Sequence, residues 1–157
     1  MSLAINPTIL EMRNVLSKFG QGAFFAHHAA AVTVNTATTL ALTTDTEIID
    51  VCSWFAGNTF TPKQPGSYLL WGSAYVTEDA DFTDGTTVLS LFIRKGGATP
   101  AYIAKTSKKA TQLTTVVMLE ANGTTDAFDL AASHTAGGGV DVSDISFGGV
   151  FVSYNNP

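Results

Sequence analysis

Apolar residues along the chain follow two different periods, and the change between them falls near Gly22. From Ile9 to Phe19 they recur at spacings of three and four residues, as on one face of an α-helix. Asn6 is a good N-cap, Pro7 is favoured at the first helical position, and Gly20 is placed to end the helix. We therefore expect a short N-terminal α-helix. Its apolar seam consists of Ile9, Met12, Leu16 and Phe19.

This predicted helix, about twelve residues long, is marginal by itself in water. Its seam must pack on its own domain, on copies of itself, or on another protein. We expect residues 1–21 to be an anchor or docking segment and residues 22–157 to form one compact domain, since a chain of this length has room for a single core.

Short segments of strand character, separated by turn residues, follow residue 22. Gly57-Asn58, Lys63–Gly66 and Asn122-Gly123 are turn signals, and the last of these predicts a hairpin. About eight to ten strands at this spacing predict an all-β sandwich or jelly roll. The main expected strands are 22–34, 47–51, 67–77, 86–94, 102–105, 112–119, 126–132 and 147–154.

The segment 67–77 is apolar on both of its faces. Since side chains alternate along a strand, one face carries Tyr68, Leu70, Ala74 and Val76, and the other carries Leu69, Trp71 and Tyr75. Burial on two sides predicts a sandwich core on one side and a further partner on the other. We expect Leu69, Trp71 and Tyr75 to lie at an interface between chains.

Composition supports an associating protein. Hydrophobic residues make up 45% of the chain and charged residues only 13%, with a mean hydropathy of +0.21. Ordinary soluble domains have about a quarter of their residues charged, so some apolar surface is expected to meet another chain. The net charge of −5 argues against nucleic acid. The sequence lacks both a transmembrane stretch and a secretory signal, which favours synthesis in a cytoplasm without membrane insertion.

Residues capable of chemistry do not form a convincing site in the sequence. His27 and His28 are adjacent on a predicted strand and so point to opposite faces, and Cys52 is expected in the core. The acidic turn Glu78–Asp84 lacks the spacing of a calcium loop, and Gly137–Gly139 lacks that of a phosphate loop. We expect no catalytic residue, no metal and no cofactor, and three histidines make a cupin-like enzyme difficult.

Three segments carry a resemblance to a known family. "GNTFTPKQPGSYLLWGSAYV" (57–76) resembles the part of C1q-like and tumour-necrosis-factor-like domains in which a short strand and a Pro-Gly turn lead into an aromatic-rich strand. "GAFFAHHAAAVTV" resembles the opening strand and "SFGGVFVSYNNP" the closing one. The resemblance covers about residues 22–157 and implies a ten-stranded jelly roll that assembles as a tight homotrimer about a threefold axis.

Bacteriophage structural proteins contain similar domains, and a Thr-, Gly- and Ala-rich chain with one cysteine is similar to those. The resemblance implies a virion protein, made and assembled in the host cytoplasm. We expect a trimeric capsid decoration or head-fibre protein whose N-terminal seam docks on the major capsid protein or another virion protein. The alternative is the tip domain of a tail fibre that binds a receptor or a host-surface glycan.

Overall fold

The computed structural model describes residues 22–35, 38–77, 80–98 and 103–154, and these form twelve β-strands and no helix. The predicted N-terminal helix and its seam lie outside the described residues. The strands are β1 (Phe24–His28), β2 (Val32–Val34), β3 (Leu40–Ala41), β4 (Thr46–Asp50), β5 (Phe55–Ala56), β6 (Thr59–Phe60), β7 (Pro65–Val76), β8 (Leu89–Lys95), β9 (Ile103–Thr106), β10 (Thr111–Asn122), β11 (Phe128–His134) and β12 (Val140–Ser153).

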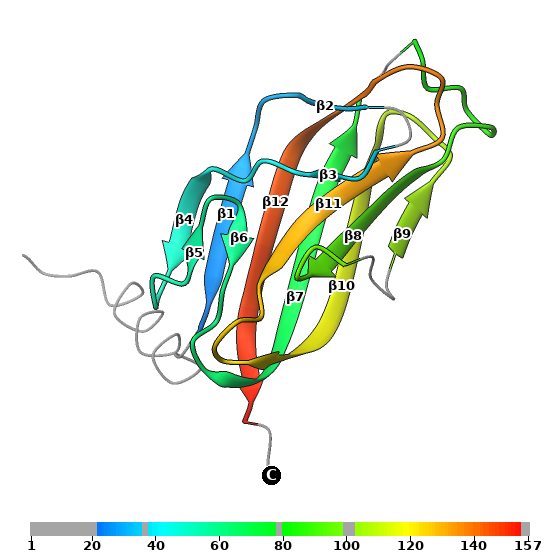
Figure 1. The fold of residues 1–157 in the computed structure, drawn as a ribbon. Helices are drawn as coiled ribbons and strands as arrows, with labels where there is room; N and C mark the ends of the chain where they lie inside the picture. Colours follow the sequence, from blue (N-terminus) through cyan, green and yellow to red (C-terminus); the bar gives the residue numbers. More distant parts are fainter. Residues whose placement is uncertain (1–21, 36–37, 78–79, 99–102, 155–157) are drawn as a thin grey trace, which may run out of the picture.

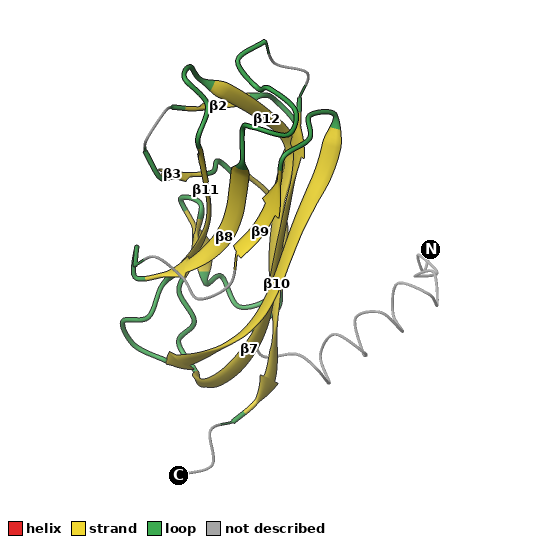
Figure 2. Cartoon of the chain, turned by 90° about the vertical axis from the view of Figure 1, so that its right-hand side faces the viewer, coloured by secondary structure: helices red, strands yellow, loops and turns green. Residues whose placement is uncertain are grey.

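The strands form two antiparallel sheets that pack face to face (Figures 1 and 2). The first sheet has the order β10-β7-β12-β1-β4, and β2 also pairs with β12. The second has the order β5-β6-β11-β8-β9, and β3 also pairs with β11. The predicted sandwich is thus confirmed. Twelve strands are present where about eight to ten were expected. The predicted strand 22–34 divides into β1 and β2, and β3, β5 and β6 are only two residues long and were not predicted as separate strands.

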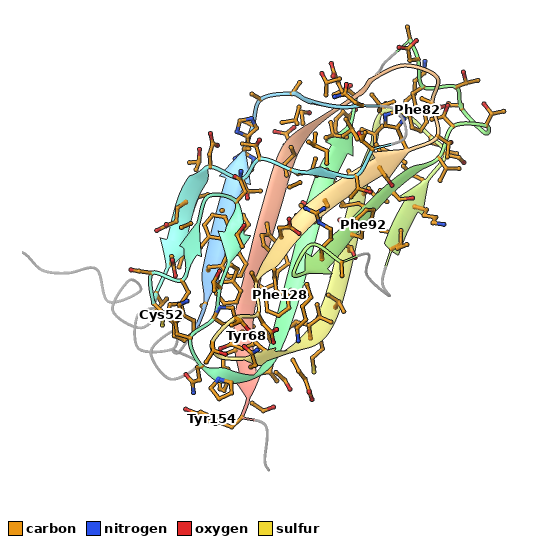
Figure 3. All side chains as sticks on the ribbon, in the orientation of Figure 1. Cys52, Tyr68, Phe82, Phe92, Phe128 and Tyr154 are labelled. Atoms are coloured by element: carbon orange, nitrogen blue, oxygen red, sulfur yellow. The ribbon has the colours of Figure 1, made fainter. Side chains whose placement is uncertain are left out.

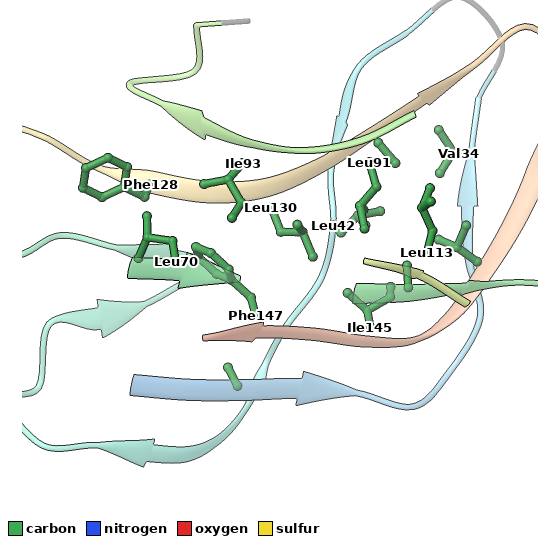
Figure 4. Close-up of a cluster of buried hydrophobic side chains, with 14 of the residues drawn as sticks. Val34, Leu42, Leu70, Leu91, Ile93, Leu113, Phe128, Leu130, Ile145 and Phe147 are labelled. Carbon is green, nitrogen blue, oxygen red and sulfur yellow. The ribbon is translucent and has the colours of Figure 1, made fainter. Parts of the chain in front are cut away.

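The core lies between the sheets and is filled by one side of each long strand. Along β7, Tyr68, Leu70, Ala74 and Val76 are all fully buried, as the alternation predicted. Leu91, Ile93 and Leu130 meet them from the second sheet (Figure 4). An aromatic cluster fills the half of the core near the start of β1, where Phe24 stacks on Phe60 with ring centroids 4.2 Å apart.

A bulge in β12 explains why this strand is longer than predicted. Ser143 pairs with Tyr75 and Ser146 with Ser73, so three steps along β12 match two along β7. The extra residue changes which positions face the core. Val142 is buried before the bulge and Ile145 after it. Because the alternation breaks in this way, the sequence pattern revealed only the second half of the strand.

The turn signals at Gly57 and Asn122 had different outcomes. Gly57 and Asn58 both have positive φ and close a two-residue hairpin between β5 and β6, as expected. The hairpin predicted at Asn122-Gly123 is wrong, because β10 pairs with β7 in the first sheet while β11 belongs to the second. Asn122 instead folds the loop between the sheets, since its Oδ1 accepts hydrogen bonds from the backbone N–H groups of residues 124–126.

Candidate functional site

The outer face of the first sheet contains the three residues expected at an interface. Leu69, Trp71 and Tyr75 alternate with buried neighbours on β7 and are each partly exposed. Their side chains therefore point away from the core, on the side that the second sheet does not cover.

Backbone pairing extends this face across β10, β7, β12, β1 and β4, five of the six strands of the sheet. Val116 pairs with Trp71, Trp71 with Gly148, Gly148 with Phe25, and Phe25 with Ile49. The adjacent row runs from Met118 through Leu69 to Val150. We call the seven side chains of these two rows the apolar face: Phe25, Ile49, Leu69, Trp71, Val116, Met118 and Val150.

Gly148 explains how a tryptophan fits into the middle of this face. A Cβ atom at residue 148 would lie only 2.5 Å from Cε2 and Cζ2 of Trp71, so the indole ring occupies the space above the glycine. On the opposite side of the sheet, a Cβ at Gly149 would lie 2.4 Å from Cδ2 of Leu70. The Gly148-Gly149 pair thus allows side chains to approach β12 closely on both faces.

The other half of the same face is polar. Thr114, Ser73, Ser146, His27 and Thr46 follow one another across the five strands. Beyond them, Gln112 and Ser143 both pair with Tyr75. Tyr75 therefore lies among polar residues, whereas Leu69 and Trp71 belong to the apolar face. The sequence placed these three residues on one face but did not divide that face into two halves.

A shallow groove of about 370 Å³ lies at the β1 and β4 side of the apolar face. Phe25, Ile49, Trp71 and Val150 line it with their side chains, and Ala23, Phe24 and Gly149 complete its wall. It contains no titratable side chain. Such a lining offers contact to apolar groups and supplies no acid, base or nucleophile.

Exposed apolar residues are concentrated on this sheet. Among the described residues, eight large hydrophobic side chains are exposed, and only Ile103 belongs to the second sheet. The others lie on strands of the first sheet or directly follow them, and are Ile48, Ile49, Val51, Val116, Met118, Val152 and Tyr154. Sequence reasoning identified the outer face through β7 alone. It did not assign Ile48 and Ile49 of β4 or Val116 and Met118 of β10 to this face.

The lower end of the domain in Figure 3 carries Tyr154 and Cys52. The ring of Tyr154 contacts Phe151 with centroids 4.9 Å apart. Cys52 is partly exposed in the bend after β4, so its predicted place in the core is wrong: its backbone N–H donates to Asp50 Oδ1 outside the sandwich. Nearby, burial raises the pKa of the Tyr68 hydroxyl to about 12, and this hydroxyl donates to the Gln64 carbonyl.

His28 and His134 each have a hydrogen-bond partner within the chain. His28 Nδ1 lies 2.7 Å from Asp45 Oδ1, and a hydrogen bond from this ring lowers the pKa of the Asp45 carboxyl group. His134 is buried, with Nε2 2.6 Å from the Val34 carbonyl and Nδ1 accepting from Ala136 N–H. No three His, Cys, Asp or Glu side chains within the described ranges are grouped as metal ligands would be.

A receptor-binding tip would use the loops between strands, and the loops 80–85, 96–98 and 136–139 lie at two different ends of the domain. Gly138 approaches Asp81 closely, so the 80–85 and 136–139 loops meet. Gly96 instead donates to the Ala127 carbonyl, near the turn that follows β10. Phe82, an aromatic residue in the 80–85 loop, is only 1% exposed and belongs to the core cluster (Figure 3). The described parts of these loops thus present no exposed ring for stacking on a sugar.

No helix capable of spanning a membrane occurs in the part of the chain that the structure describes. No protein-family model matches the chain, and no curated protein does so either. Solved structures do match. The globular domain of zebrafish complement 1qA protein aligns with a TM-score of 0.59 and 15% identity, covering 86% of this chain and 99% of that one.

Two further solved structures give the same result. Eiger TNF from S. frugiperda aligns with a TM-score of 0.54 and 15% identity over 87% of this chain and 96% of its own. Murine APRIL aligns with a TM-score of 0.57 and 11% identity over 83% and 99%. At these identities the likeness concerns the fold, and it confirms the predicted architecture: the chain is an all-β jelly roll of the C1q and tumour-necrosis-factor type.

Proposed function

We propose that this protein is a non-enzymatic structural module that assembles as a homotrimer through the outer face of its first sheet. The observation that carries this proposal is the apolar face, which exposes side chains such as Val116 and Met118 at 55% and 57%. Exposed apolar surface of this kind is typical of protein interfaces. The trimer is the assembly that the resemblance to C1q-like and tumour-necrosis-factor-like domains implies.

The module serves, in this proposal, as a capsid decoration or head-fibre protein of a bacteriophage, made and assembled in the host cytoplasm. Its jelly roll forms the body on the virion surface. Residues 1–21 attach it, with Ile9, Met12, Leu16 and Phe19 docking on the major capsid protein or another virion protein. The low charge content and the single cysteine support this role over that of a secreted, disulfide-bonded protein.

Sedimentation equilibrium of the purified chain at micromolar concentration tests the assembly. We expect one species of three times the chain mass of 16.5 kDa. A monomer would overturn the proposal that the apolar face is a trimer interface.

Removal of residues 1–19 tests the docking segment. The shortened chain should remain a folded trimer by sedimentation and circular dichroism, but should no longer co-sediment with purified phage particles. The full chain, mixed with the same particles, is the control. Loss of folding on truncation would assign the seam to the domain core instead, and undiminished co-sedimentation would place the virion contact elsewhere.

A further inference from the structure

The two sides of the apolar face differ in shape. On the β10 side, Val116 and Met118 project from the sheet and are 55% and 57% exposed. On the β1 and β4 side, the face is hollowed into the 370 Å³ groove between Phe25, Ile49, Trp71 and Val150. A projection and a hollow of the same apolar character thus occupy opposite edges of one sheet.

The projecting side also lies on an edge that requires cover. β10 pairs only with β7, so along its 12 residues one row of backbone groups has no neighbouring strand in its sheet. Long edge strands with exposed apolar side chains promote uncontrolled pairing unless something covers them. Along the outer side of β10, however, the exposed residues include only one charged side chain, Glu120.

A projection and a groove can meet in two kinds of contact. In an isologous, twofold contact each copy inserts its projection into the groove of the other, and the assembly stops at two chains. A heterologous contact places the projection of one copy in the groove of the next, and the same contact repeated by rotation closes a ring. The homotrimer proposed above requires the second kind of contact, because an isologous contact joins chains only in pairs.

We propose that Val116 and Met118 of one subunit insert into the groove lined by Phe25, Ile49, Trp71 and Val150 of the next subunit. This inference rests on the trimer proposed above and names the surfaces that join its subunits. In this arrangement Trp71 lies between two projecting strands. It pairs with Val116 of its own β10, and it lines the groove that receives β10 of another subunit.

The polar half of the face sets the limit of this contact. Thr114, Ser73 and Ser146 follow directly after the apolar rows and would lose water without gaining apolar partners. We therefore place the close contact in the half of the face that contains the start of β1 and the end of β12. Tyr75 lies at its rim rather than at its centre.

Cross-linking between single cysteines tests the pairing. In a Cys52→Ser background, Met118→Cys and Ile49→Cys are introduced together, and the trimer is treated with a short bismaleimide. Both positions are exposed, so both substitutions should leave the circular dichroism spectrum unchanged. We expect covalent dimers and trimers on a denaturing gel. Ile49→Cys combined with Thr86→Cys, which lies in an exposed loop, is the matched control and should give only single chains.

Mixing single variants tests whether Met118 meets Ile49 of another chain or Met118 of that chain. Chains with Met118→Cys alone and Ile49→Cys alone should not cross-link separately, but should give a covalent pair after they are mixed, unfolded and refolded together. Efficient dimers from Met118→Cys alone would overturn the inference in favour of a self-paired edge. A trimer by sedimentation that gives no cross-link would overturn the inference and leave the trimer proposal standing, whereas a monomer by sedimentation would overturn both.

Discussion

The buried ring of His134 connects strands of different sheets through backbone atoms. It lies on β11, and its Nε2 is 2.6 Å from the carbonyl of Val34 on β2, while Nδ1 accepts from Ala136 N–H. With this network Nε2 carries the proton. Both ring nitrogens are thus occupied by the fold, and neither is available to a metal or a substrate. His134 therefore has a structural role. The sequence alone could not distinguish this role from that of a metal ligand or a catalytic residue.

Replacing His134 by Leu keeps an apolar side chain in the space but removes both hydrogen bonds. The Val34 carbonyl and the Ala136 N–H then remain buried without this partner, and we expect a loss of about 2–4 kcal/mol in the free energy of unfolding. His27→Leu, on the partly exposed outer face, is the control and should change it by less than about 0.5 kcal/mol. Urea denaturation at one protein concentration measures both; equal losses would contradict the assigned role.

The carboxyl groups of two aspartates make the free energy of unfolding depend on pH in the acidic range. Burial works to raise the pKa of Asp126, but hydrogen bonds from Lys95 and from the Asn122 backbone outweigh it, so the pKa lies below its ordinary value of 3.8. The hydrogen bond from His28 lowers the pKa of Asp45 in the same direction. A lowered pKa stabilises the folded state above the ordinary value, and this contribution is lost as the pH falls through the folded-state pKa.

We therefore expect the free energy of unfolding to decrease as the pH falls below 3.8, the ordinary carboxyl value. In Asp126→Asn part of this decrease should be absent, because the substituted side chain does not titrate. Denaturation series from pH 7 down to about pH 2 compare the two chains. Glu120→Gln serves as the control with an exposed carboxylate, and identical pH profiles for the wild type and Asp126→Asn would refute the assignment.

Among the strands, β12 decides how the first sheet is assembled, since it pairs with β7, β1 and β2. Its bulge lets Val142 and Ile145 both face the core although they are an odd number of residues apart. Asp144 supplies the extra residue and has a φ of 46°, a conformation that is strained for a residue with a side chain. The local backbone, rather than apolar periodicity, thus sets the register of the longest strand.

Deletion of Asp144 should therefore leave the register of β12 intact. Without the extra residue, Ser143 can still pair with Tyr75 and Ser146 with Ser73, and Val142 and Ile145, then two positions apart, both still face the core, so we expect the deletion variant to be folded by circular dichroism. Asp144→Gly accepts the positive φ at no steric cost and should keep or raise the stability by up to about 1 kcal/mol. An unfolded deletion variant would show that the bulge itself is needed for folding.

The assembled domain has one face whose exposed surface is apolar and one end at which β1 begins and β12 finishes (Figure 1). Neighbouring residues of β7 point to opposite sides of the sheet. Substitutions on one side should therefore affect folding, and substitutions on the other side should affect association. Leu70 is fully buried in the core, whereas Leu69 is partly exposed on the apolar face. These two leucines form a matched pair for testing what the outer face does.

Leu69→Asp should give a folded monomer, because the charge is placed at the proposed interface without entering the core. Leu70→Asp should prevent folding, because a carboxylate would be buried there without a partner. Sedimentation and circular dichroism distinguish the two results. If Leu69→Asp remained a trimer at the concentrations at which the wild type is one, the apolar face would not be the interface.

Much of the fold was readable in the sequence because apolar segments of strand length are separated by glycine-containing turns. Those features depend on neighbours in the chain and on the two-residue period of a strand. The short pairs β3 and β5–β6 were less visible. Asn122-Gly123 was misread because a turn signal does not reveal whether the next strand joins the same sheet.

The sequence by itself determined the class of fold, the two-faced character of β7 and the apolar content that calls for a partner. Only the tertiary structure decided that Val116 and Met118 lie opposite a groove built from Phe25, Ile49 and Val150, and that Tyr75 belongs to the polar half. The physical reason is register: strands far apart in the chain become neighbours through backbone pairing, and a shift of one residue would move every side chain to the other face.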